Sequence, residues 1–371
     1  MVRSGAWRIR CVAHQLRGAT GAPAERCVLP VPARCAPHHQ RPFSTRRTFS
    51  TRRLSTRRTF GTHRAFTHAA PSAPVRTLST RRTLSIRRTS RTRRTLYNFL
   101  MPFDVDARVM WNRRLSPDYN VLALEAPEIA AATEPGQFVM VKPGHDGDPL
   151  LRRPFSVFEI LRDESGATTG LTILSKRIGT TTRQLYAAEA ESRVQCLGPL
   201  GRPFTLPDRE TEVWMVAGGV GLAPFATVAE TLAPKGVTAT LFYGARRAEE
   251  LFYLEYFEKL GVRLALSTED GSRGDHGRIT VPLRRALAQS AGERPILIHA
   301  CGPEPMLAAV AHLAAEFGRP CEVSVERVMG CGLGGCYSCV VPVKTATGAH
   351  HVRSCIGGPV FDAATIVWDG R

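Results

Sequence analysis

The chain has 371 residues, of which 43% are hydrophobic, and it carries 50 Lys and Arg against 32 Asp and Glu. A chain of this length can bury the cores of two or three domains. The excess charge lies entirely in the first hundred residues, which hold 22 Arg, no Lys and one acidic residue, Glu25. Residues 101–371 are nearly neutral, which argues against a globular part that binds nucleic acid through its charge. No run of 18 apolar residues occurs, so we expect no membrane span and a cytoplasmic location.

Residues 1–100 are predicted to be a disordered, low-complexity basic extension. They repeat short Arg-rich units such as "STRRTFSTRRLSTRRTF", which repel one another and bring few large apolar side chains. Three interpretations remain open: a targeting peptide, an arm that binds nucleic acid or anionic lipid, and translated DNA upstream of the true start. We favour the last, or an extension without function, because globular patterning begins abruptly at Met101.

Residues 101–208 show six short strand patterns separated by Gly, Pro and Asp, which predicts an antiparallel β-barrel. "LLRRPFSVFEI" places a fixed cation at Arg153, a stiff residue at Pro154 and a hydroxyl at Ser156. Further on, Gly179 and Thr180 precede a predicted helix, and a helix N-terminus can hold a pyrophosphate. The same residues also fit a strand-edge Arg and a helix-capping Thr.

Residues 209–320 alternate apolar strands with helices, which predicts a doubly wound α/β domain. "VWMVAGGVGLAP" ends its strand at Gly218, Gly219 and Gly221, where small residues let a dinucleotide approach the backbone. A tight turn without any ligand fits this pattern equally well. Met306 is expected to pack in the core, and Cys196 and Cys321 are expected to be plain buried thiols.

Within the predicted C-terminal module, residues 321–371, four of the ten cysteines crowd into residues 331–355. The spacing C-x₄-C-x₂-C-x₁₅-C is typical of the plant-type [2Fe–2S] cluster, and the surrounding glycines suit a tight loop around it. Structural zinc usually uses two C-x₂₋₄-C pairs, which are not both present, and a disulfide pair is the other alternative. The predicted ligands are Cys331, Cys336, Cys339 and Cys355.

The motifs R-P-x-S, G-T at a helix start, "GPLGRPF", "AGGVGLAP" and "CGPEPM" together resemble the ferredoxin-reductase superfamily of flavoproteins. The resemblance implies nicotinamide contacts at Gly218, Gly219, Gly221 and Gly302. It also implies that Cys301, the one catalytic candidate, lies where nicotinamide meets flavin. The flavin contacts that it implies are Arg153, Pro154, Phe155, Ser156, Leu174, Ser175, Lys176, Gly179 and Thr180.

The short gap to Cys355, followed by "GPVF", narrows the resemblance to electron-transfer subunits of NAD-linked (type B) dihydroorotate dehydrogenases. This family implies FAD, a [2Fe–2S] cluster and NAD as co-substrate. Its implied partner is an FMN-containing catalytic subunit in a two-plus-two heterotetramer, with electrons passing to NAD⁺ in pyrimidine biosynthesis. We therefore expect an oxidoreductase subunit without nucleic-acid or membrane partners.

Two alternatives stay open at this point. The first is a flavin subunit of NADH-dependent ferredoxin:NADP⁺ oxidoreductase or of sulfide dehydrogenase. The second, from another functional class, is a non-enzymatic nucleic-acid-binding protein with a basic arm and a structural zinc site.

Overall fold

The structure is a computed structural model that describes residues 101–368, except for residues 145–148 and 291–293. The basic extension predicted for residues 1–100 lies outside the described residues. No helix in the described part has the length and hydropathy to cross a membrane.

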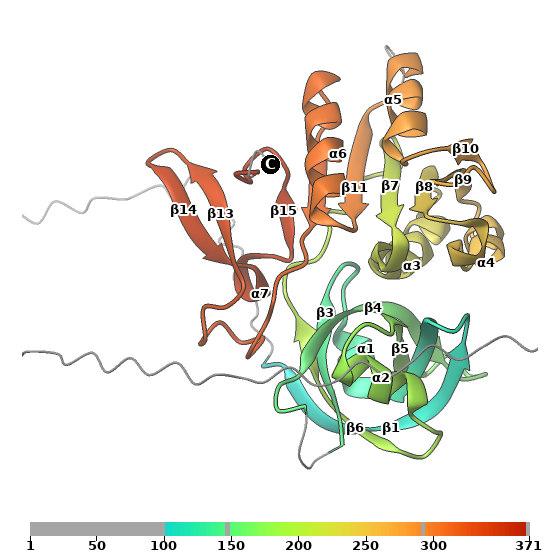
Figure 1. Cartoon of the computed structure of the whole chain (residues 1–371), viewed down its shortest axis with the longest axis vertical. Coiled ribbons are helices and arrows are strands. Elements are labelled where there is room, and N and C mark those ends of the chain that lie inside the picture. The colour runs from blue at the N-terminus through green and yellow to red at the C-terminus, as the bar shows by residue number, and fades with distance from the viewer. Residues whose placement is uncertain (1–100, 145–148, 291–293, 369–371) are drawn as a thin grey trace, which may run out of the picture. The chain divides into compact units, whose positions relative to one another are not determined.

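The first domain is a closed barrel of six antiparallel strands in the order β1-β2-β5-β4-β3-β6 (Figure 1). Alternate residues such as Val109, Leu122, Ile173 and Val194 fill its interior and are almost fully buried. The predicted barrel is confirmed. Its elements are β1 (Phe103–Arg114), β2 (Tyr119–Glu125), α1 (Pro127–Ala132), β3 (Phe138–Pro143), β4 (Arg153–Arg162), β5 (Thr168–Lys176), α2 (Thr180–Ala187) and β6 (Arg193–Leu200).

The second domain is built on a seven-stranded sheet in the order β10-β9-β8-β7-β11-β12-β15. Its strands are parallel except for β15, which pairs antiparallel with β12. Its elements are β7 (Glu212–Gly218), α3 (Ala223–Leu232), β8 (Ala239–Ala245), α4 (Leu254–Lys259), β9 (Arg263–Thr268), β10 (Asp275–His276), α5 (Thr280–Gln289), β11 (Ile296–Cys301), α6 (Glu304–Glu316), β12 (Cys321–Ser324) and β15 (Val360–Asp362).

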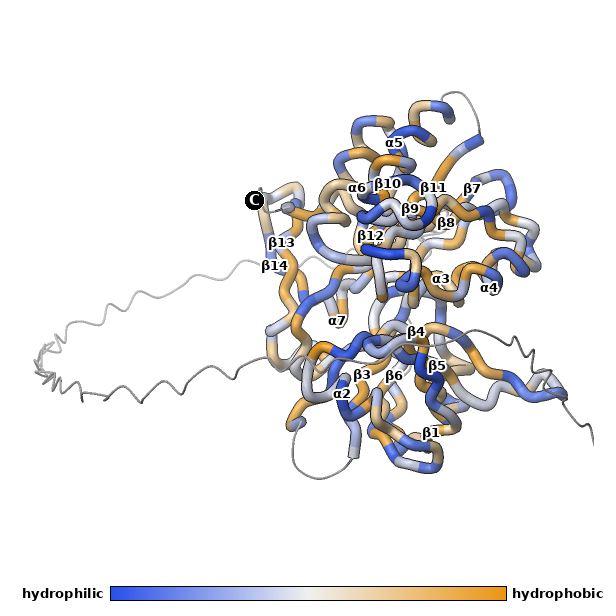
Figure 2. Tube along the Cα trace, turned by 45° about the vertical axis from the view of Figure 1, so that its right-hand side comes forward, coloured by the Kyte–Doolittle hydropathy of each residue, from blue (hydrophilic) through white to orange (hydrophobic). Residues whose placement is uncertain are grey.

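Both faces of this sheet are covered by helices, as predicted for a doubly wound domain. Along β7, Val213 and Met215 pack with α3 and α4, whereas Trp214 and Val216 pack with α5 and α6. A strand that is buried on both faces needs a continuous apolar run. Figure 2 shows such orange segments along the central strands.

The cysteine-rich part leaves the sheet after Ser324 at the end of β12 and returns at Val360, the first residue of β15. These two residues are register partners across the two strands. The intervening residues 325–359, which we call the cysteine arm, hold the cysteine loop (residues 330–339), the hairpin β13 (Val340–Thr345) and β14 (Gly348–Arg353), and α7 (Ser354–Gly357). The predicted boundary between residues 320 and 321 thus lies just before a strand of the α/β sheet.

The cysteine arm packs against the barrel. Met140 of β3 and Leu200 of β6 share a hydrophobic cluster with Met329, Cys339 and Cys355. A Cβ atom at Gly332 would lie 2.7 Å from Cγ of Met140, so the loop backbone runs directly over the barrel wall. The packing therefore places the predicted metal ligands beside the domain predicted to bind flavin.

Candidate functional site

A cavity with a volume of about 670 Å³ lies where the barrel, the α/β domain and the cysteine arm meet. All nine residues that the resemblance assigned to flavin binding line it, and so does Cys301. The barrel supplies the ends of β4 and β5 and the start of α2. One cavity thus gathers predicted residues that lie up to 148 positions apart, from Arg153 to Cys301.

Two polar groups at this cavity suit a polar ligand. The Oγ atom of Ser175 is buried and has no hydrogen-bond partner among the described residues. Arg153 is exposed, and its guanidinium donates to the backbone carbonyls of Leu151 and Arg152, at 3.0 and 3.2 Å, and to no carboxylate among the described residues. A buried hydroxyl without a partner is costly, and a cation without a carboxylate can receive an anion.

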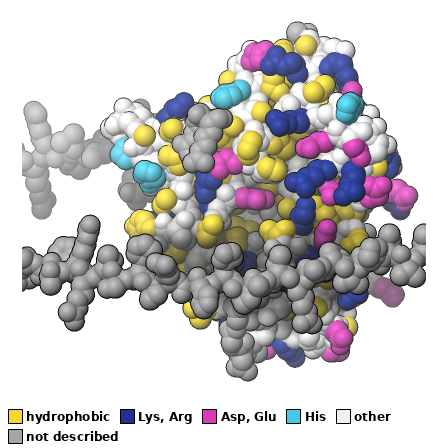
Figure 3. All heavy atoms as spheres, viewed as in Figure 1, with side chains coloured by type: hydrophobic (Ala, Val, Ile, Leu, Met, Phe, Trp, Pro, Cys, Tyr) yellow, Lys and Arg dark blue, Asp and Glu magenta, His cyan; other side chains and the backbone are white. Residues whose placement is uncertain are grey.

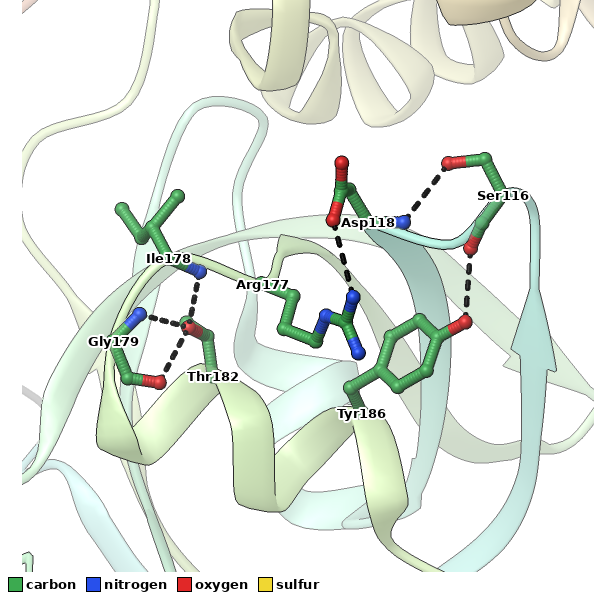
Figure 4. A network of polar contacts seen from close by, with 7 residues as sticks. All are labelled: Ser116, Asp118, Arg177, Ile178, Gly179, Thr182 and Tyr186. Atoms are coloured by element: carbon green, nitrogen blue, oxygen red, sulfur yellow. Dashed lines mark hydrogen bonds and ion pairs between the residues drawn. The ribbon is translucent and has the colours of Figure 1, made fainter. Parts of the chain in front are cut away.

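The start of α2 is held rigidly at the cavity wall. Thr182 Oγ1 accepts hydrogen bonds from the backbone N–H groups of Ile178 and Gly179, both at 2.9 Å (Figure 4). The next amides of the first turn have no acceptor within a helix. A Cβ atom at Gly179 would meet nothing within 4 Å, so open space lies beside these amides. Such a turn suits a phosphate or pyrophosphate.

The segment around this turn is anchored further along. Figure 4 shows Arg177 reaching toward Asp118, with 3.4 Å between the charged atoms, while the Tyr186 hydroxyl donates to the carbonyl of Ser116 at 3.0 Å. The Arg177 guanidinium also lies 5.0 Å from the Tyr186 ring centroid. These contacts tie α2 to the β1–β2 turn and keep its N-terminus in place.

Cys301 ends β11 at the side of the cavity formed by the α/β domain. Burial, and to a smaller extent the nearby Glu326 carboxylate, raise the pKa of its thiol to about 12. At neutral pH the group is therefore a neutral thiol that can contact a ligand but is no nucleophile.

At three of the four predicted nicotinamide-binding glycines, neighbouring protein atoms leave no room for a side chain. A Cβ atom at Gly221 would lie 2.1 Å from the carbonyl oxygen of Cys301, and one at Gly218 or Gly302 would meet Met306 at 2.7 Å. Only Gly219, with φ of +56°, has open space beside it. The packing role expected for Met306 is confirmed, and Cys196 and Cys321 are buried as expected.

Residues 324–329, which sequence analysis assigned no site role, also line the cavity. They follow β12 and lead directly into the cysteine loop. Two hydrophobic residues that line the cavity are largely exposed, Val328 at 82% and Ile178 at 76%. Hydrophobic side chains also reach the surface on the face seen in Figure 3. No local pattern in these residues marks them as part of a cavity, and Arg327 stands four positions before the first loop cysteine, Cys331.

The four cysteines of the cysteine arm form two pairs. Cys339 and Cys355 are buried, and their Sγ atoms lie 3.3 Å apart. Hydrogen bonds from Ser338 and then from Cys331 lower the pKa of the exposed Cys336 thiol to about 6. Within the described residues, no three His, Cys, Asp or Glu side chains gather as a single-ion site would require.

The loop backbone is fitted closely to these sulfurs. The amide of Leu333 donates to Sγ of Cys331 at 3.4 Å, and the amide of Gly330 donates to Oγ of Ser338 at 2.9 Å. A Cβ atom at Gly330 would lie only 3.1 Å from Sγ of Cys336. Any larger residue at this position would press on the Cys336 thiol, so glycine gives the loop its close fit.

Two domain profiles match the chain. "Iron-sulfur cluster binding domain of dihydroorotate dehydrogenase B" matches residues 326–367, and "Oxidoreductase NAD-binding domain" matches residues 215–312. These matches cover the cysteine arm and the α/β domain, which were predicted from the cysteine spacing and the strand–helix alternation.

Curated relatives match over nearly their full length. The dihydroorotate dehydrogenase B (NAD(+)) electron transfer subunit of Desulforamulus reducens is 34% identical over 264 residues, which are 71% of this chain and 98% of the relative. The subunits of the same name from Geobacillus thermodenitrificans and Enterococcus faecalis are 35% and 34% identical, over 66% and 70% of this chain and 91% and 96% of theirs.

A solved structure of NADH-dependent reduced ferredoxin-NADP oxidoreductase is similar with a TM-score of 0.61 and 26% identity, covering 71% of this chain and 91% of that one. A ferredoxin reductase of carbazole 1,9a-dioxygenase, at 21% identity and a TM-score of 0.51, shares the fold. The curated relatives are more similar in sequence and carry the name to which the cysteine spacing pointed. The chain belongs to the family of electron transfer subunits of NAD-linked dihydroorotate dehydrogenase B.

Proposed function

We propose that the cavity holds FAD, that the cysteine loop holds a [2Fe–2S] cluster, and that NAD binds at the carboxyl edge of the α/β sheet. With these groups the chain relays electrons from a dihydroorotate-oxidising subunit to NAD⁺ in pyrimidine biosynthesis. The main support for this proposal is the cavity of about 670 Å³, because the barrel, Cys301 and the segment leading into the cysteine loop all line it. A bound flavin can connect the two carriers, because it transfers two electrons with nicotinamide and single electrons with an iron–sulfur cluster.

The flavin-binding roles follow from the chemistry of the lining groups. Arg153 offers a cation to a phosphate, and the first turn of α2 after Gly179 offers backbone amides to the pyrophosphate. The partnerless hydroxyl of Ser175 can bond to a polar edge of the ligand. Cys301 stays protonated and packs where the ring and a nicotinamide would meet.

The arrangement of the cysteines favours a two-iron cluster over zinc. A cluster with four cysteine ligands binds each of its two irons through two thiolates, so it needs two pairs of cysteines rather than one tetrahedral group. The pairs here are Cys331 with Cys336 and Cys339 with Cys355. An amide already directed at Sγ of Cys331 adds the kind of contact that tunes a cluster.

The catalytic partner is proposed to be an FMN-containing subunit, in an assembly of two copies of each chain in the cytoplasm. The name of the curated relatives, electron transfer subunit, supports a separate catalytic partner. The half-buried Cys331 and the exposed Cys336 support electron entry at the cysteine loop, because a cluster bound there lies near the surface.

The test is reconstitution. The chain is purified with and without a co-expressed dihydroorotate-oxidising subunit, and NADH formation from NAD⁺ and dihydroorotate is followed by absorbance. We expect NADH only when both subunits are present, together with bound FAD and about two irons per chain. A colourless, iron-free protein would refute the cofactor assignment. Reduction of NADP⁺ by reduced ferredoxin, without dihydroorotate activity, would instead favour the ferredoxin alternative.

A further inference from the structure

The side chain of Arg353 joins the two segments that carry the cysteines. Arg353 is the last residue of β14 and stands two positions before Cys355. Its Nη1 atom donates to the carbonyl of Gly334, inside the loop that carries the other three cysteines, at 2.7 Å. A Cβ atom at Gly334 would lie 3.3 Å from this same Nη1 atom and 2.8 Å from Cγ1 of Ile356, so the contact depends on glycine.

The same guanidinium supports a strained residue. Tyr337, between Cys336 and Cys339, has φ of +58°, a left-handed conformation that is unfavourable for a residue with a Cβ atom. Its side chain is 62% exposed, so little core packing holds it there. The carbon of the Arg353 guanidinium lies 4.6 Å from the centroid of the Tyr337 ring, a cation–π contact that holds the ring in place.

Arg353 forms no ion pair with a carboxylate among the described residues. None of the ion pairs found among the described residues includes Arg353, whereas Arg284, Arg285 and Arg327 each pair with an acid. Two ferric irons, their two bridging sulfides and four thiolates together carry net negative charge, and one-electron reduction adds another negative charge. A half-buried cation next to this group stabilises the reduced state more than the oxidised state.

Resting on the proposed function, we infer that Arg353 is a positioning residue for the cluster. Its planar fork braces the loop through Gly334 and Tyr337, and its charge raises the reduction potential of the cluster. These are two separable effects, because a lysine keeps the charge but not the planar fork.

The test uses the holoprotein and the variants R353Q and R353K. The matched control is K344Q, which removes one positive charge from an exposed position near the far end of the same hairpin. Dithionite supplies the single electron, and the reduced cluster is followed by electron paramagnetic resonance during a potentiometric titration. Loss of visible absorbance in the presence of an iron chelator measures how firmly the loop holds the cluster.

We expect R353Q to shift the ratio of reduced to oxidised cluster at a fixed potential about tenfold toward the oxidised form, which is about 59 mV for a one-electron couple. R353K should keep the potential but lose the cluster to the chelator several-fold faster than the unaltered protein. K344Q should match the unaltered protein in both measurements.

If R353Q holds no iron, the result supports the role of Arg353 in bracing the loop. The reduction potential of R353K then tests the effect of the charge. An R353Q protein with unchanged potential, resonance and chelator rate would overturn the inference. So would an R353K protein that matched R353Q in potential, because the charge would then not matter. Failure of the unaltered protein to hold iron would contradict the proposed function instead.

Discussion

The sulfur atoms of Cys339 and Cys355 lie 3.3 Å apart although 15 residues separate them in the chain. The hairpin β13–β14 makes this possible, because it returns the chain to its starting point and the amide of Ser354 donates to the carbonyl of Cys339 at 2.8 Å. Two buried thiols without a disulfide are thereby brought to the separation that one shared metal centre requires.

Replacing Cys336 by serine should remove the cluster and leave the flavin site intact. The exposed thiol is one member of the Cys331–Cys336 pair, and an alcohol is a poor ligand for iron. We expect loss of iron and of electron exchange with the catalytic partner, with reduction of bound FAD by NADH retained. Stopped-flow absorbance separates the two steps. C321A, which removes a buried thiol outside the cysteine arm, is the control, and full coupled activity in C336S would contradict the ligand assignment.

Replacing Arg153 by glutamine should weaken FAD binding. A charge-assisted hydrogen bond to a phosphate contributes about 1.5–3 kcal/mol, so the dissociation constant should rise roughly 10- to 100-fold. Quenching of flavin fluorescence during titration of the apoprotein measures it. Arg162, at the other end of β4, bonds only to Thr168 among the described residues, so R162Q should leave the affinity unchanged. Equal effects of the two substitutions would show that Arg153 has no specific role.

Alanine at Gly221 should destabilise the α/β domain far more than alanine at Gly219. At Gly221 the new methyl group would meet the carbonyl of Cys301 at 2.1 Å, so the backbone must move, at a cost of about 3 kcal/mol or more. At Gly219 the space is open, and the left-handed φ of +56° costs only about 1 kcal/mol. Urea unfolding measures both. Similar losses of stability would mean that the contact with Cys301 does not explain the glycine.

The carboxyl group of Glu230 should make stability depend on pH at the seam between α3 and the barrel. Burial raises its pKa, although the Tyr256 hydroxyl, which donates to it at 2.6 Å, counteracts part of the rise. A raised pKa means that the folded state binds the proton more tightly than the unfolded state. The resulting stability is complete below the unfolded pKa of about 4.3 and is lost as pH rises through the folded value.

The variant E230Q keeps a hydrogen-bond acceptor but cannot ionise, so it should gain melting temperature relative to the unaltered protein as pH rises from about 4 to 7. Differential scanning calorimetry at several pH values checks this. E249Q, at an exposed position, serves as the control. A melting-temperature difference for E230Q that stayed constant with pH would exclude titration of this carboxyl as the cause.

The sequence allowed the local parts of the site to be predicted. The R-P-x-S strand, the Gly179–Thr180 helix start and the cysteine loop are short motifs whose chemistry resides in neighbouring residues. All nine predicted flavin residues line one cavity for this reason. The barrel and the doubly wound sheet also followed from strand and helix patterns, because both depend on local periodicity.

The parts that depend on long-range pairing could not be predicted. Residues 324–329 reach the cavity because β12 pairs with β11, which places the exit of β12 beside Cys301. No local pattern in "SVERVM" signals this neighbour. The crowding at Gly218 and Gly302 likewise depends on Met306, a side chain one turn into α6 that touches both glycines only after folding.

Because Ser324 and Val360 are register partners, the cysteine arm begins and ends at the same place on the sheet edge. Strands β12 and β15 are antiparallel neighbours, so a turn of a few residues could connect them and complete the sheet edge. The metal-binding segment is in effect an enlarged hairpin turn, grafted onto a nucleotide-binding core that closes without it. Reductases that keep this core and lack the arm are therefore sterically feasible, and gain or loss of the one-electron carrier needs no rebuilding of the sheet.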